Sequence, residues 1–127
     1  MYLWIDDTKQ APYGHIWCKS VNEAKQKIQE YEELYEQVLD EYDFPSISLW
    51  KSTPIKIIDI GYDAGDYRSE GGDYIMLLRW LEKTGRDYPI RIHTTNKKGI
   101  AKMRKIIRKN GWNEIPCQET KHSEGDL

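Results

Sequence analysis

Residues 55–60 read IKIIDI, an apolar run that only Lys56 and Asp59 interrupt. Such a run of β-branched side chains is typical of a strand that is buried on both faces of a parallel sheet. Similar short runs predict three more strands, at residues 2–5 (YLWI), 15–18 (HIWC) and 88–94 (YPIRIHT).

Helical patterns alternate with these strands. Ser20 and Glu23 have the spacing of a capping box, and apolar residues then recur every three or four positions as far as Tyr42. This pattern predicts a helix over residues 20–43 that is about 33 Å long, nearly twice the length of a typical strand. Two further helices are expected, one from Asp73 to Thr84-Gly85 and one from Thr95 or Asn96 to Asn110-Gly111.

The order of elements predicts an α/β fold, in which four parallel strands are joined by right-handed crossovers and flanked by helices. The 127 residues, 39% of them hydrophobic, suffice for one domain. We expect it to span residues 1–115, including the long acidic helix 20–43, with a flexible tail at 116–127. Cys18 and Cys117 lack disulfide or metal-binding spacing, and no apolar run could span a membrane, so we expect a cytoplasmic protein with no membrane partner.

The net charge of −2 conceals two oppositely charged segments. Residues 20–43 carry a local charge of −6 and residues 97–109 a local charge of +7. Both could be solvated faces of amphipathic helices, or each could bind a partner. The basic helix could follow a phosphate backbone, although the near-neutral chain weighs against it, and the acidic helix could bind a protein or its own copy in a homodimer. The expected acidic partner surface consists of Glu32, Glu33, Glu36 and Asp40.

Acidic residues lie where the predicted strands end. Asp6 and Asp7 follow the first strand, Asp63 follows the third, and Asp59 lies within the third. Open α/β sheets bind ligands beyond the carboxyl ends of their strands, and neighbouring strands are only about 4.8 Å apart. Asp6 and Asp7, with Asp59 or Asp63, are therefore candidate Mg²⁺ ligands or partners that share a proton. Alternatively, Asp6 and Asp7 only begin a turn and cap Thr8-Lys9.

The residues after the fourth strand form a candidate phosphate site. His93-Thr94-Thr95-Asn96 leads into the N-terminus of the basic helix, where backbone amides and the helix dipole favour an anion. His93 could donate or accept a proton there at neutral pH, or it could be a hydrogen-bonded structural residue. The expected phosphate-binding residues are Thr94, Thr95, Asn96, Lys97 and Lys98.

A family resemblance rests on three segments: LWIDD (3–7), DIGYDAGDYRSEGGDYIMLLRWLE (59–82) and YPIRIHTTNKKGIAKMRKIIRKNGW (88–112). Together they resemble the cyclic-phosphate processing receiver-like domains. The resemblance implies a small receiver-like (flavodoxin-like) three-layer fold with strand order 2-1-3-4, which binds or processes a phosphate or cyclic-phosphate nucleotide or RNA end. The positions that match the family motifs are Asp6, Asp7, Asp59, Asp63, Gly65, His93, Asn96 and Gly99.

Gly61 and Tyr62 depart from the family pattern, which has an Asp-His pair at these positions. An aspartyl phosphate cannot form at Gly61, so ordinary two-component signalling at that position is excluded. If catalysis survives, the resemblance implies a metal-assisted phosphoesterase or cyclic phosphodiesterase-like hydrolase with His93 and Asp63 as catalytic residues. The alternative is a catalytically inactive binding or inhibitor protein, of the phage or mobile-element type, that acts through the acidic helix.

Overall fold

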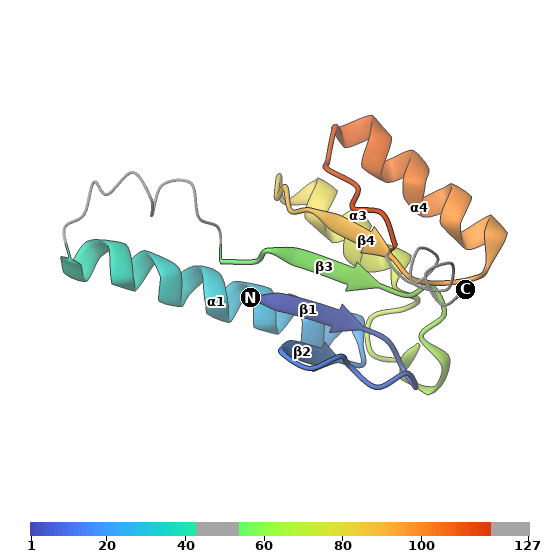
Figure 1. Ribbon diagram of the computed structural model, residues 1–127, viewed down its shortest axis with the longest axis horizontal. Helices are drawn as coiled ribbons and strands as arrows, with labels where there is room; N and C mark the ends of the chain where they lie inside the picture. The colour runs from blue at the N-terminus through green and yellow to red at the C-terminus, as the bar shows by residue number, and fades with distance from the viewer. Residues whose placement is uncertain (43–53, 118–127) are drawn as a thin grey trace, which may run out of the picture.

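The computed structural model describes residues 1–42 and 54–117. Within these ranges four strands, β1 (Tyr2–Ile5), β2 (His15–Cys18), β3 (Ile57–Ile60) and β4 (Ile90–Ile92), form one parallel sheet in the order β2-β1-β3-β4 (Figure 1). The predicted α/β class and strand order are confirmed. None of the helices in the described ranges has the length and apolar composition needed to cross a membrane.

The two faces of the sheet differ in chemistry because side chains alternate along each strand. Leu3, Ile58 and Ile90 lie side by side in register and are fully buried. They belong to the core that includes side chains of α1 (Val21–Tyr42) and α3 (Ile75–Lys83), and each such buried side chain contributes about 1.5–3 kcal/mol to folding. The corresponding row on the opposite face consists of Trp17, Trp4, Asp59 and Arg91.

The long helix α1 begins as its sequence predicts. The Ser20 hydroxyl accepts the Glu23 backbone N–H at 3.0 Å, and the Glu23 carboxylate accepts the backbone N–H of Lys19 at 2.9 Å, one residue earlier than in a regular capping box. The second half of α1 projects beyond the sheet (Figure 1), where Leu34 and Val38 are exposed.

The strands β3 (Ile57–Ile60) and β4 (Ile90–Ile92) are shorter than the runs at residues 55–60 and 88–94 that predicted them. Pro89 has no N–H to donate, and its carbonyl instead accepts the backbone N–H of Ile58 at 2.9 Å, just before β4 begins. Residues 61–72 follow β3 and contain four glycines, and we call them the glycine-rich loop. This loop contains a short 3₁₀ helix, η1 (Gly65–Tyr67), which the sequence patterns did not predict. After the last helix, α4 (Lys97–Asn110), the chain returns to β4. The Ile90 backbone N–H donates to the Asn113 carbonyl at 2.9 Å, and the Ile90 carbonyl accepts the backbone N–H of Ile115 at 2.7 Å.

The prediction that Asp73 caps the second helix is wrong. Tyr74 occupies the cap position of α3 without a side-chain bond. Asp73 Oδ1 instead accepts the backbone N–H of Ala64 and the Nε–H of Arg68, both at 3.1 Å. Asp73 therefore holds the preceding loop closed rather than starting the helix.

The basic helix α4 (Lys97–Asn110) has the predicted ends. Asn96 Oδ1 accepts the backbone N–H of Gly99 at 3.0 Å, which selects Asn96 over Thr95 as the cap. Gly111 ends the helix in the left-handed conformation at φ 69°, where glycine has no steric cost. Residues 118–127 lie outside the described residues, so the expected tail and the domain boundary at residue 115 stay predictions.

Candidate functional site

A pocket of about 180 Å³ lies at the carboxyl edge of the sheet. Three segments meet there, residues 6–9 after β1, residues 61–63 after β3 and residues 93–95 after β4. The structure thus brings together several of the residues that the sequence singled out at strand ends. Those that line the pocket are Asp6, Asp7, Asp63, His93, Thr94 and Thr95.

His93 is held between two buried carboxylates. Its Nε2 lies 2.7 Å from Asp6 Oδ2, and its Nδ1 lies 2.6 Å from Asp59 Oδ1. The exposed fractions are 7% for His93, 7% for Asp6 and 3% for Asp59. We call Asp6, His93 and Asp59 the carboxylate–histidine chain.

Trp4 and Arg91 fix the carboxylate–histidine chain from the polar face of the sheet. The Trp4 ring stacks on the His93 ring, with centroids 3.9 Å apart and planes 3° from parallel. Trp4 Nε1–H donates to the Lys9 carbonyl at 2.8 Å, and Arg91 Nη1 donates to Asp59 Oδ2 at 3.2 Å. The imidazole therefore cannot rotate toward the pocket without breaking two buried hydrogen bonds and a ring stack.

The second oxygen of Asp6 caps the turn that follows β1. Asp6 Oδ1 accepts the backbone N–H groups of Thr8 at 3.0 Å and Lys9 at 2.8 Å. Burial alone would raise the pKa of Asp6, but these two amides and His93 outweigh burial and lower it. The turn-capping alternative is thus realised by Asp6, which at the same time holds His93.

Two of the three expected Mg²⁺ ligands, Asp6 and Asp59, are engaged in hydrogen bonds, and Mg²⁺ binding stays a prediction. Asp6 and Asp59 lie on opposite sides of His93 with both carboxylate oxygens accepting hydrogen bonds. In residues 1–42 and 54–117, no group of three or more His, Cys, Asp or Glu side chains is placed to hold a metal ion. The expected ligand set of Asp6, Asp7 and Asp59 therefore enters no step of the function proposed below.

The Asp63 side chain forms hydrogen bonds within the glycine-rich loop. Its Oδ1 accepts the Gly65 backbone N–H at 2.9 Å and an Arg68 Nη2–H at 2.7 Å, and its side chain is 69% exposed. The Gly65 amide and the Arg68 guanidinium lower the pKa of Asp63. Asp7 also lines the pocket and has no ion pair in the described part of the chain.

Gly61 and Tyr62, which depart from the family pattern, both pack closely against other residues of the site. A Cβ atom on Gly61 would lie 3.2 Å from Asp6 Oδ2 and 3.4 Å from His93 Nε2, so a larger residue would crowd the carboxylate–histidine chain. The Tyr62 ring packs against Gly99, where a Cβ would lie 2.5 Å from Tyr62 Cγ. Tyr62 lines the pocket wall and leaves the pocket open.

The first turn of α4 borders the pocket. Thr94 Oγ1 accepts the backbone N–H of Asn96 at 3.2 Å, so Thr94 and Asn96 both stabilise the start of the helix. Thr95, Lys97 and Lys98 are exposed. Sequence reasoning missed one more cation, Lys9, which lines the pocket from the turn after β1. Its position two residues after the paired acids was the only signal for it.

The four residues of the expected acidic partner surface do not share one environment. Glu32 binds Arg86 through two nitrogens, at 2.7 and 2.8 Å, and accepts the Tyr88 hydroxyl at 2.5 Å. Glu33 and Glu36 are exposed, and the side chain of Asp40 lies outside the described residues. Only Glu33 and Glu36 can therefore be assigned to an open surface.

Comparison with known proteins identifies a family for this chain. The sequence model of the family described as cyclic-phosphate processing receiver domain matches residues 1–109. No curated protein and no solved structure matches the chain.

Proposed function

The chain belongs to the family of cyclic-phosphate processing receiver domains, and from this premise we propose that it binds the phosphate or cyclic-phosphate end of a nucleotide or RNA. The binding site is the pocket at the carboxyl edge of the sheet. The observation that carries the proposal is that Thr94 and Thr95, which line this pocket, lead directly into the N-terminus of α4, where Lys97 and Lys98 are exposed. A helix N-terminus with adjacent lysines attracts a phosphate through its free amides and its dipole.

The charge balance of the pocket supports an anionic ligand. Asp6 faces His93, and Asp63 is paired with Arg68. Asp7 is the lining carboxylate without an ion pair in the described residues. The three lysines near this edge, Lys9, Lys97 and Lys98, therefore outnumber the unpaired acid.

Binding is favoured over hydrolysis by the state of the expected catalytic residues. A general acid or base must reach the reacting proton, whereas both ring nitrogens of His93 are already bonded to carboxylates and its side chain is only 3% exposed. Asp63 is bonded to Arg68. His93 therefore cannot transfer a proton to a ligand without breaking one of these bonds, and Oδ1 of Asp63 is occupied by Gly65 and Arg68.

Calorimetry with 2′,3′-cyclic AMP, with adenosine as the unphosphorylated comparison, tests the proposal. We expect binding in buffer containing EDTA, no binding of adenosine, and at least tenfold weaker binding by a Lys97→Glu/Lys98→Glu variant. Lys56→Glu/Lys83→Glu, which makes the same charge change at two exposed lysines away from the pocket, is the matched control. Absence of heat with the wild-type protein at millimolar cyclic nucleotide, or unchanged binding by the double variant, contradicts the proposal.

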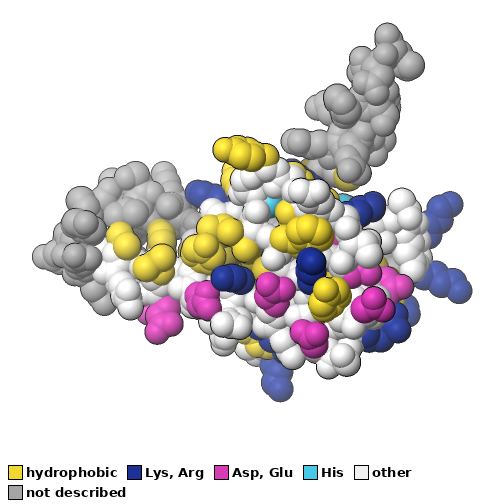
Figure 2. Space-filling model, turned by 90° about the horizontal axis from the view of Figure 1, so that it is seen from below, with side chains coloured by type: hydrophobic (Ala, Val, Ile, Leu, Met, Phe, Trp, Pro, Cys, Tyr) yellow, Lys and Arg dark blue, Asp and Glu magenta, His cyan; other side chains and the backbone are white. Residues whose placement is uncertain are grey.

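The inactive binding protein remains a second candidate because of the projecting half of α1. Figure 2 shows hydrophobic and acidic side chains next to one another on this part of the molecule. The exposed residues of this half of α1 include Leu34, Glu33 and Glu36. A Glu33→Lys/Glu36→Lys variant should lose a protein partner that the wild type retains in a pull-down. Equal retention by both proteins removes this surface from consideration. Glu32 is left unchanged because its replacement would break the contact with Arg86.

A further inference from the structure

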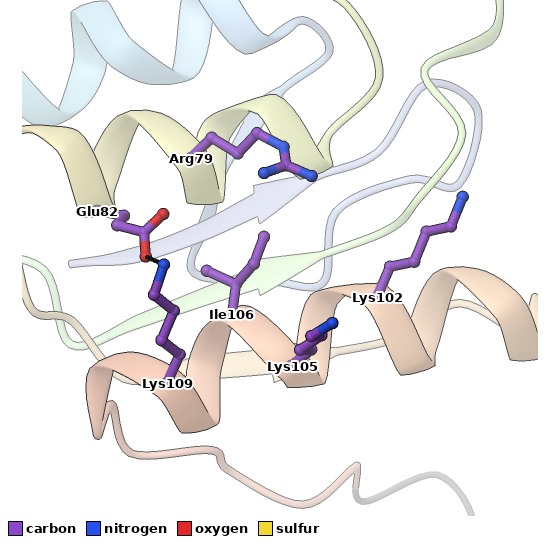
Figure 3. A pocket seen from close by; sticks show the side chains of 6 residues that line it. All are labelled: Arg79, Glu82, Lys102, Lys105, Ile106 and Lys109. Atoms are coloured by element: carbon purple, nitrogen blue, oxygen red, sulfur yellow. Dashed lines mark ion pairs between the residues drawn. The ribbon is translucent and has the colours of Figure 1, made fainter.

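A second cationic surface lies in a groove between α3 and α4, separate from the phosphate pocket. The groove has a volume of about 360 Å³, and Ile106 forms its floor between charged side chains from both helices (Figure 3). Its lining residues are Arg79, Glu82, Lys102, Lys105, Ile106 and Lys109.

The groove carries an excess of positive charge that the domain does not neutralise. Its one acid, Glu82, is 3.3 Å from Lys109 Nζ and accepts an Asn110 amide N–H at 2.9 Å. Arg79, Lys102 and Lys105 make no ion pair within the part of the chain that the structure describes. Like charges that converge from two helices repel one another, so an anion in the groove would lower the free energy of the domain.

The lysines of α4 connect the groove with the pocket. Lys98, Lys102, Lys105 and Lys109 are spaced four, three and four residues apart, which places them on one side of the helix at about one per turn of 5.4 Å. The series starts at the helix end that adjoins the pocket and continues into the groove. One phosphate group cannot contact all of these charges, whereas a chain of phosphates can.

We propose that the groove between α3 and α4 binds the sugar–phosphate backbone of single-stranded RNA whose terminal phosphate occupies the pocket. This inference rests on the function proposed above and narrows its ligand class from any terminal phosphate to an RNA strand end. No aromatic side chain is among the groove-lining residues, so the contact follows the backbone and is independent of base sequence. An acidic polypeptide is the competing occupant, which the experiment below distinguishes.

Salt dependence gives the expected size of the effect. For single strands the logarithm of affinity falls with the logarithm of salt concentration by about 0.7 for each phosphate neutralised. Three additional contacts, to Arg79, Lys102 and Lys105, should make the slope for an oligonucleotide steeper than that for a mononucleotide by about 2. Between 50 and 200 mM salt this difference corresponds to an additional loss of affinity of about 20-fold.

The experiment measures fluorescence anisotropy of a 5′-labelled ten-nucleotide RNA with a 2′,3′-cyclic phosphate end, and competition by 2′,3′-cyclic AMP. Wild-type protein should bind the RNA at least tenfold more tightly than the mononucleotide, with the steeper salt slope. Lys102→Glu/Lys105→Glu should lose at least tenfold in RNA affinity and leave mononucleotide affinity unchanged. Lys56→Glu/Lys83→Glu, which makes the same charge change at two exposed lysines outside the groove, is the matched control, and circular dichroism checks that each variant is folded.

The outcomes separate the two proposals. Equal affinity of wild-type protein for RNA and mononucleotide, or equal losses in both double variants, overturns the groove proposal while the terminal-phosphate function stands. Binding of neither ligand overturns both. A glutamate decapeptide that displaces the RNA at comparable concentration assigns the groove to an acidic polypeptide and also overturns the proposal.

Discussion

At the residue scale, His93 illustrates how a side chain with the chemistry of a catalytic base can serve as a structural link between two buried carboxyl groups. Its imidazole joins Asp6, directly after β1, to Asp59 within β3, and β1 and β3 are the two central strands of the sheet. Removing one partner of a buried hydrogen-bonded pair leaves the other group unsatisfied, at a large desolvation cost. The contribution of His93 to the free energy of unfolding should therefore be large.

His93→Gln should lower the free energy of unfolding by about 3–5 kcal/mol, the usual cost of breaking a buried charge pair. Urea unfolding followed by circular dichroism measures this change, and loss of the ring stack with Trp4 should alter the tryptophan emission of the folded variant. Asp63→Asn is the control, since its pair with Arg68 is exposed and such pairs contribute little. A His93→Gln protein with the urea midpoint of wild type contradicts this account of the carboxylate–histidine chain.

The sequence identified these residues without identifying how they pair. The sequence placed both Asp6 and His93 at the carboxyl ends of strands, and in the structure the two side chains are hydrogen-bonded to each other. Asp59 was assigned to a metal site, whereas its side chain lies on the face opposite Ile58, next to Trp4 in register. The pairing depends on this register between distant strands, which residue patterns within one strand do not encode.

At the element scale, the contact between the loop after β3 and the first turn of α4 depends on one missing side chain. Gly99 lies inside the helix and does not have a positive φ, so its conformation alone does not require glycine. The requirement comes from Tyr62, whose ring atoms Cγ, Cδ1 and Cδ2 would lie 2.5–2.8 Å from a Cβ at that position.

Gly99→Ala should therefore destabilise the domain by about 1–3 kcal/mol through overpacking, although alanine favours helices by up to about 1 kcal/mol over glycine. In a Tyr62→Ala background the overpacking disappears, and the same substitution should become stabilising. A double-mutant cycle of thermal or urea unfolding measures this reversal of sign. Stabilisation by Gly99→Ala in the wild-type background shows that the ring moves aside without cost and contradicts the prediction.

Helix ends were predicted well where the signal was local, and poorly where it was not. Ser20 and Asn96 cap their helices through bonds within three residues, so a short motif contains all the necessary information. Asp73 has the same residue type as a cap but bonds Ala64, nine residues away. The path of the glycine-rich loop determines that contact, and no local spacing indicates it.

At the scale of the whole molecule, the separated charges of the sequence are partly paired in the fold. Arg104 of the basic helix binds Glu114 at 2.5 Å, and Glu32 of the acidic helix binds Arg86 at 2.7 Å. These partners lie outside the two charged segments, so counting charge by segment overstated both surfaces. The lysines that remain without an ion pair in the described residues include Lys9 of the phosphate pocket and Lys102 and Lys105 of the groove, which is where the proposed ligand would contact the domain.

The same internal pairs determine how stability depends on pH. Burial would raise the pKa of Glu32, but hydrogen bonds from Arg86 and Tyr88 outweigh burial and lower it. The hydrogen-bond partners of Asp6 likewise outweigh burial and lower the pKa of Asp6. The unfolded chain then binds more protons than the native domain near pH 4. Stability is fully present above the ordinary carboxyl values of 3.8 and 4.5 and is lost as the pH falls through the lowered native values.

At alkaline pH the sign reverses because of Cys18. Burial, with Glu23 nearby, raises the pKa of its thiol from 9.0 to about 12, so the native domain keeps a proton that the unfolded chain has lost. The free energy of unfolding should thus fall below about pH 4 and again above pH 9, by up to about 1.4 kcal/mol per pH unit for each proton. Urea unfolding from pH 3 to 11 measures both arms. Glu32→Gln should reduce the loss of stability at acidic pH, and Cys18→Ala should reduce the loss at alkaline pH. Glu36→Gln, at an exposed position, should change neither. Stability that rises on acidification below pH 4 contradicts the assignment.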